Sequence, residues 1–103
     1  WDKPSLPCLA TRFPYGTQIT REKIMQVASA EECLAGFGIR QLRVRDHGNI
    51  ARIEVSRMDM PMLIDERTAT QIMEKFKALG YTYVTLDLQG YRMGSMNEPL
   101  TER

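Results

Sequence analysis

The sequence predicts a small α+β domain, and three observations support this fold class. Apolar residues recur at spacings of three and four over about 21–36 and 66–79, which is typical of amphipathic helices. Two segments rich in β-branched residues lie between these helices and flank a turn sequence, and an alternating segment follows the second helix. At 103 residues, the chain is long enough for one domain with a modest core.

The composition is that of an ordinary globular domain, with 43% apolar and 26% charged residues. Fourteen basic and thirteen acidic residues leave a formal charge of +1, so we expect no nucleic-acid or membrane partner. No apolar run approaches the roughly 20 residues of a membrane-spanning helix. We therefore expect a cytoplasmic protein with reduced thiols at Cys8 and Cys33. Because the chain begins without Met, we expect it to be part of a longer protein.

Residues 1–19 are expected to form an extended segment between domains, because three prolines and Gly16 interrupt any periodic pattern. This segment carries Cys8. The domain itself is expected over 20–97, followed by a disordered tail over 98–103.

The first helix is predicted over about 21–36, with Thr20 as its N-cap and Gly36 near its end. The sequence from Ser29 to Glu32 also fits a capping box, so two short helices are the alternative. We favour one continuous helix.

A β-hairpin is predicted over 39–45 and 50–55, because the connecting sequence contains Gly and Asn, which accept positive φ. With its tip at His47 and Gly48, Val44 faces Ala51 on an apolar face. His47 is then exposed, and with no second histidine in the chain it is a poor metal or triad candidate.

The second helix is predicted over about 66–79 and ends at Gly80. The third strand is predicted over 81–88, with alternate residues from Thr82 directed inward and those from Tyr81 directed outward. These elements predict a small, largely antiparallel three-stranded sheet with two helices on one face.

A right-handed crossover through the second helix would make the third strand parallel to the second. The third strand then lies beside the first strand or leaves a gap for an added strand. The arrangement resembles a ferredoxin-like unit that lacks its first strand.

The polar face of the predicted hairpin carries Arg43 opposite Arg52, with Arg45 and Glu54 nearby. Like charges across a sheet repel, so this face makes sense if an anion or carboxylates lie among the arginines. The alternative is an ordinary solvated face that Glu54 and Asp87 balance.

Glu31 falls on the apolar stripe of the first helix, where a carboxylate needs an arginine, a metal ion or a raised pKa. Alternatively, Ala30 lies in the core and Glu31 lies at its border. Cys8 is a nucleophile or sulfur donor if Arg12 favours its thiolate, or else a small apolar filler.

Three motifs in order along the chain resemble one known family. They cover residues 4–16 (PSLPCLATRFPYG), 43–55 (RVRDHGNIARIEV) and 84–97 (VTLDLQGYRMGSMN). They resemble the C-terminal part of the ATP-dependent sacrificial sulfur transferases of the PP-loop pyrophosphatase superfamily. That family helps to make the nickel-pincer nucleotide cofactor of lactate racemase.

The resemblance implies a missing N-terminal domain that binds ATP and Mg through an S-G-G-x-D-S loop and adenylates a carboxylate of a pyridinium mononucleotide. It implies that Cys8 attacks the activated acyl group, gives up its sulfur and becomes dehydroalanine. It also implies roles for seven charged residues: substrate or phosphate contacts for Arg12, Arg43, Arg45, Arg52 and Arg92, and metal binding for Glu31 and Glu54.

Three hypotheses about function follow. The first is an ATP-dependent sulfur transferase that is a homo-oligomer when full length, with this chain inactive and free of cofactor when alone. The second is a substrate-binding module of another PP-loop ATP pyrophosphatase, in which a cluster or persulfide supplies the sulfur. The third is an oligomerisation module that buries the methionine-rich turn at Met58, Met60 and Met62.

Overall fold

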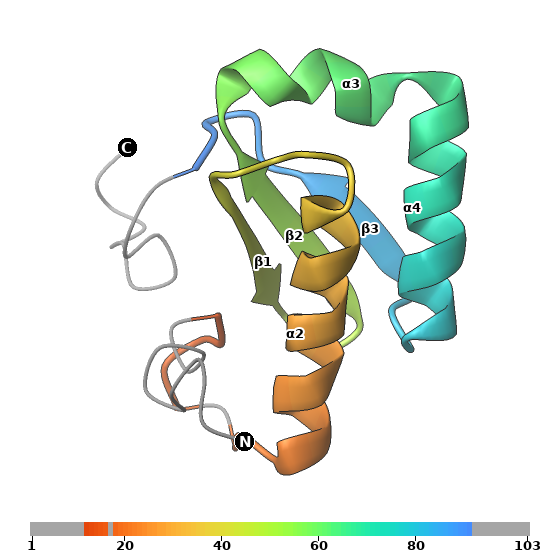
Figure 1. Ribbon diagram of the computed structural model, residues 1–103. Helices are drawn as coiled ribbons and strands as arrows, with labels where there is room; N and C mark the ends of the chain where they lie inside the picture. Colours follow the sequence, from red (N-terminus) through yellow and green to blue (C-terminus); the bar gives the residue numbers. More distant parts are fainter. Residues whose placement is uncertain (1–11, 17, 92–103) are drawn as a thin grey trace.

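The computed structural model describes residues 12–16 and 18–91 of the chain. Figure 1 shows the order of elements as helix, hairpin, short helix, long helix and strand, which confirms the α+β class. The elements are α2 (Arg21–Ala35), β1 (Leu42–Asp46), β2 (Ile50–Val55), a short 3₁₀ turn η1 (Arg57–Asp59), α3 (Met60–Ile64), α4 (Glu66–Ala78) and β3 (Tyr83–Leu86).

The first helix is continuous, as favoured from the sequence, and passes Ser29 without a break. Thr20 caps it as predicted, because its Oγ1 accepts a hydrogen bond of 3.2 Å from the backbone N–H of Lys23. Ala30 is fully buried, so the placement of Ala30 in the core with Glu31 at its border is confirmed.

The sheet has the strand order β1-β2-β3, in which β2 pairs antiparallel with β1 and parallel with β3. It is therefore mixed, with one ladder of each kind. The predicted parallel direction of β3 is confirmed, but its predicted position is wrong. Since β3 lies directly beside β2, the backbone groups of β2 are paired on both sides, and the sheet has no gap for a missing ferredoxin-like strand.

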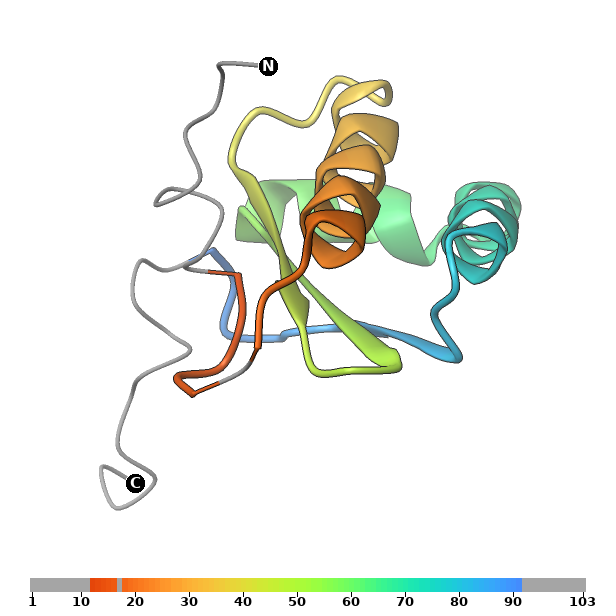
Figure 2. The same ribbon diagram turned by 90° about the horizontal axis from the view of Figure 1, so that it is seen from below.

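Both long helices cover the same face of the sheet, as predicted, and Figure 2 shows α3 on that side as well. Their apolar side chains and those of the strands form one core. Its buried members are Ala30, Leu34, Ile39, Leu42, Val44, Ala51, Ile53, Val55, Leu63, Ile72, Phe76 and Tyr81. Within the described residues, no helix is long and apolar enough to cross a membrane.

The hairpin differs from its predicted register. Arg43 lies opposite Glu54, and Arg45 lies opposite Arg52. The tip moves by one residue because the Asp46 carboxylate accepts a hydrogen bond of 2.9 Å from Gly48 N, which has a φ of +83°. Each residue therefore faces a partner two positions further along β2, and the apolar and polar faces stay as predicted.

The third strand is shorter than predicted. Val84 and Leu86 point toward the core as expected, but the alternation does not continue at either end. Tyr81 precedes the strand and is buried, whereas Thr82 and Leu88 are exposed. The prediction of Tyr81 as outward and of Thr82 and Leu88 as inward was wrong, because the strand period of two holds only within the paired residues.

Candidate functional site

The candidate site is the polar face, by which we mean the face of the sheet opposite the helices. Arg43 and Arg45 reach it from β1, and Arg52 and Glu54 reach it from β2, because side chains alternate across a strand. Arg45 is 1% exposed and Glu54 is fully buried. The alternative of a solvated face is therefore wrong for these two residues, although the balance by Glu54 and Asp87 that it expected is present.

A network of ion pairs joins the three strands on this face. Glu54 lies between two arginines, with Oε1 3.0 Å from Arg45 Nη2 and Oε2 2.8 Å from Arg52 Nη1. Arg52 Nη1 also lies 2.5 Å from Oδ2 of Asp87, which directly follows β3. The repulsion between the opposed Arg45 and Arg52 is offset by carboxylates of the chain itself, one of the two possibilities that the sequence left open.

Arg43 takes no part in this network, although Glu54 is its partner in the ladder. Its guanidinium lies over the ring of Tyr91, with Cζ 5.1 Å from the ring centroid. Its Nη1 donates a hydrogen bond of 2.8 Å to Leu42 O. Arg43 and Arg52 are both partly exposed, whereas Arg45 is buried, so Arg43 is an arginine of this face that a ligand can reach.

Arg12 and Glu31 form a second charged pair at the outer edge of β1. Arg12 Nε and Nη2 donate to the two carboxylate oxygens of Glu31 at 2.7 and 3.1 Å. Glu31 Oε2 also accepts from Val44 N at 2.9 Å, and Arg12 O accepts from Asp46 N at 2.7 Å. These contacts occupy the backbone N–H groups of Val44 and Asp46 at the outer edge of β1, where a further strand would otherwise pair, so we call this edge closed.

A buried carboxylate that was predicted only as part of the turn lies at the end of β1. Asp46 is fully buried and accepts hydrogen bonds from Tyr81 Oη at 2.8 Å, from Gly48 N and from Lys23 Nζ at 3.3 Å. Burial and the hydrogen bond to Asp46 raise the pKa of Tyr81 above its ordinary value. The alternation of Leu42 and Val44 could have predicted that Asp46 points inward.

The charged residues singled out in the sequence therefore form separate groups. Arg45, Arg52 and Glu54 lie together, Arg12 pairs with Glu31, and Arg43 stacks on Tyr91. Cys8 and Arg92 lie outside the described residues. Within the described part of the chain, no group of three or more His, Cys, Asp or Glu side chains could hold a metal ion, so these residues alone do not form a metal site. The metal-binding role of Glu31 and Glu54 stays a prediction.

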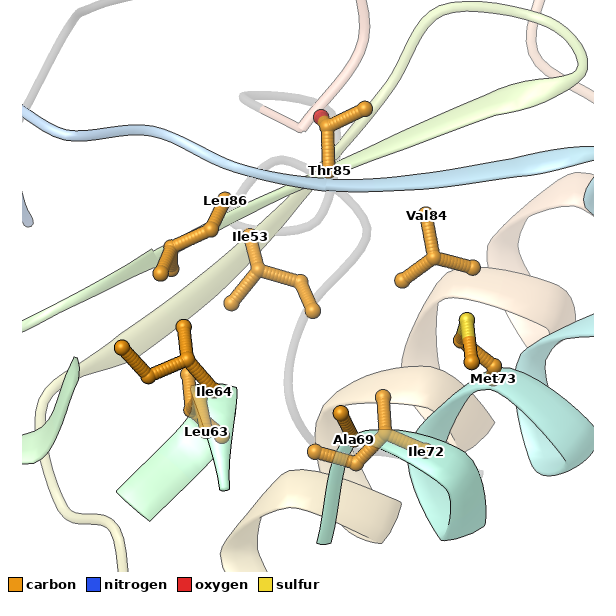
Figure 3. A pocket seen from close by; sticks show the side chains of 9 residues that line it. All are labelled: Ile53, Leu63, Ile64, Ala69, Ile72, Met73, Val84, Thr85 and Leu86. Atoms are coloured by element: carbon orange, nitrogen blue, oxygen red, sulfur yellow. The ribbon is translucent and has the colours of Figure 1, made fainter. Parts of the chain in front are cut away.

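An apolar groove lies on the helix side of the sheet, between α3, α4 and β3. Its volume is about 290 Å³, and Figure 3 shows the side chains that line it. Val84 points from β3 toward Met73 of α4, and Thr85 points the opposite way. The lining is apolar apart from Thr85, so the groove offers little to orient a polar substrate.

Filling this groove should stabilise the fold. We expect Ala69→Leu to raise the free energy of unfolding by about 1 kcal/mol, because Ala69 lines the groove and Leu suits a helix. Ala30→Leu is the matched control and should lower that free energy by about 2 kcal/mol, because Ala30 is fully packed. Urea denaturation measures both. If both substitutions changed the free energy of unfolding in the same direction, the groove would not be space that a larger side chain can fill.

Three curated proteins resemble the chain, and no family model matches it. The chain is 43% identical to an uncharacterized protein of Synechocystis sp., and the match covers 99% of the chain and 38% of that protein. It is 41% identical to the pyridinium-3,5-bisthiocarboxylic acid mononucleotide synthase of Lactiplantibacillus plantarum, over 99% of the chain and 36% of the synthase.

An uncharacterized protein of Methanocaldococcus jannaschii is 35% identical over 86% of the chain and 34% of its own length. The chain thus spans just over a third of the length of the curated relatives that it matches.

Proposed function

We propose that the chain is the C-terminal part of an ATP-dependent sulfur transferase that acts on a pyridinium mononucleotide in nickel-pincer cofactor biosynthesis. The observation that supports this most strongly is the 41% identity to a pyridinium-3,5-bisthiocarboxylic acid mononucleotide synthase, which extends over 99% of the chain. The motif resemblance to sacrificial sulfur transferases of the PP-loop superfamily points to the same chemistry.

In the proposed reaction, a carboxylate oxygen of the substrate attacks the α-phosphorus of ATP and releases pyrophosphate. The Cys8 thiolate then attacks the acyl carbon, forms a thioester and expels AMP. A base removes the α-proton of Cys8, the bond between its β-carbon and sulfur breaks, and the sulfur leaves with the electron pair on the product thiocarboxylate. Cys8 is left as dehydroalanine, so each chain donates one sulfur.

Among the described residues, the arginines of the polar face suit the anionic groups in this reaction. Arg43 is the one whose guanidinium is outside the ion-pair network, so we propose that it contacts a phosphate of the nucleotide. Arg45 and Arg52 already bind Glu54, and we propose that they fix the shape of this face. Arg12, which is held by Glu31, is proposed to anchor the segment that carries Cys8.

We propose that ATP and Mg bind mainly outside this chain. The sequence contains no S-G-G-x-D-S loop, and the described residues do not by themselves form a metal site. An N-terminal ATP-binding domain of the same protein is the proposed partner, and the complete enzyme is proposed to be a homo-oligomer. The relatives support this proposal, because the chain spans only just over a third of their length and the rest of each relative has room for such a domain.

Mass spectrometry of the complete protein after one turnover tests the proposal. We expect the Cys8 peptide to lose the mass of one sulfur and two hydrogen atoms, while the peptide with Cys33 keeps its mass. Cys8→Ser should still release pyrophosphate but form no thiocarboxylate, and Cys33→Ser should behave as the parent protein does. Product formation with Cys8 unchanged would overturn the sacrificial mechanism.

A further inference from the structure

The turn after β3 brings Tyr91 back over the polar face. Asp87 begins this turn, because its Oδ1 accepts from Gln89 N at 2.9 Å and its carbonyl accepts from Gly90 N at 3.1 Å. Gly90 has a φ of +89°, and a Cβ at this position would lie 3.3 Å from Val55 O. Only glycine therefore fits well here. Tyr91 N then donates a hydrogen bond of 3.0 Å to the same Val55 oxygen, which holds Tyr91 at the end of β2.

The Tyr91 ring reaches Arg43 because Leu42, the preceding residue in β1, is paired with Val55. The guanidinium of Arg43 thus has two contacts, the ring of Tyr91 and the hydrogen bond from Nη1 to Leu42 O. An arginine has five N–H donors, all in the plane of the guanidinium. The cation–π contact with Tyr91, in which Cζ lies over the ring 5.1 Å from its centroid, is not a conventional hydrogen bond, so it holds the group in place without pairing its donors with an acceptor atom.

The charges of the polar face distinguish Arg43 from its neighbours. Two arginines and two carboxylates form the network of Arg45, Glu54, Arg52 and Asp87. Arg43 adds a third guanidinium to this face, and within the described residues no carboxylate pairs with it. An oxyanion that binds at Arg43 therefore does not need to break an existing ion pair.

We propose that Tyr91 is a positioning residue for a phosphate-binding site at Arg43. The ring orders a long side chain before the ligand arrives, so phosphate binding loses less side-chain entropy. The inference rests on the proposed function, in which the ligand is the phosphate of a mononucleotide. It adds a specific role for an aromatic residue that does not itself contact the reacting atoms.

NMR of the complete protein, with inorganic phosphate as the probe, tests this role. The Nε–Hε signal of Arg43, assigned with Arg43→Lys, should show a ring-current shift in the parent protein. Tyr91→Leu should abolish that shift and weaken phosphate binding about fivefold. Tyr91→Phe should keep both, because it retains the ring. Tyr91→Met replaces Tyr91→Leu if the latter does not fold.

The possible failures are distinguishable. Unchanged phosphate affinity in Tyr91→Leu, or a loss in Tyr91→Phe equal to that in Tyr91→Leu, would overturn the positioning role. If Arg43→Gln binds phosphate as the parent protein does, the anion-binding role of Arg43 is itself wrong. In the turnover assay, the positioning role predicts that Tyr91→Leu raises KM for the nucleotide more than it lowers kcat, with rescue by Tyr91→Phe.

Discussion

Glu54→Gln is expected to lower the free energy of unfolding by about 3 kcal/mol, the largest loss that we predict for a single substitution. Glu54 is fully buried and contacts both Arg45, whose side chain is 2% exposed, and Arg52. A glutamine keeps the volume but removes the charge, so the buried guanidinium of Arg45 loses a carboxylate partner where water cannot replace it, while the partly exposed Arg52 keeps its contact with Asp87. Urea denaturation measures the loss.

Glu74→Gln is the matched control. Glu74 is exposed on α4, so the same chemical change should alter the free energy of unfolding by less than about 0.5 kcal/mol. If Glu54→Gln costs as little as this control, then the network on the polar face contributes no net stability.

Asp46→Ala is expected to lower the free energy of unfolding by about 2 to 3 kcal/mol. The substitution removes a fully buried acceptor from the hydroxyl of Tyr81, the N–H of Gly48 and the ammonium group of Lys23. The Asx turn that sets the hairpin register is lost with it. Tyr81→Phe removes one of these hydrogen bonds and should cost about 1 kcal/mol.

The same pair predicts a pH dependence at high pH. Burial, followed by the hydrogen bond to Asp46, raises the pKa of Tyr81 above its ordinary value of 10.0, so the folded state favours the neutral phenol. The stability from Tyr81 is complete below the unfolded pKa of about 10 and falls as the pH rises above it. Between pH 8 and pH 10.5, the free energy of unfolding should fall less in Tyr81→Phe than in the parent protein, as denaturation at the two pH values will measure. An equal fall in the two proteins would show that Tyr81 does not cause the pH dependence.

Much of the fold could be predicted because its signals are local. The apolar spacing in α2 and α4 and the cap at Thr20 depend on residues within a few positions of one another. The exact pairing could not be predicted in the same way. Which of two possible hairpin tips forms is decided by one hydrogen bond from the backbone N–H of Gly48 to the Asp46 carboxylate, and the position of β3 is decided by packing across the whole sheet.

The sequence could predict which types of residue form the candidate site, but not which of these residues contact one another. The alternation along the hairpin placed Arg43, Arg45 and Arg52 on one face, and the structure agrees. The contact between Arg43 and Tyr91 joins residues far apart in the sequence through a glycine turn, so no local pattern indicates it. The same is true of the hydrogen bond between Tyr81 and Asp46, which are 35 positions apart.

The closed edge of β1 has a consequence for how the sheet can be extended. A strand added beside β1 would have to displace the Glu31 carboxylate from Val44 N and the Arg12 carbonyl from Asp46 N. At the opposite edge, β3 is the last strand of the sheet within the described residues, and it borders the apolar groove. Pairing of another part of a longer chain with β1 would therefore break these two hydrogen bonds, whereas pairing with β3 would leave both intact, so β3 is the favoured edge for strand addition.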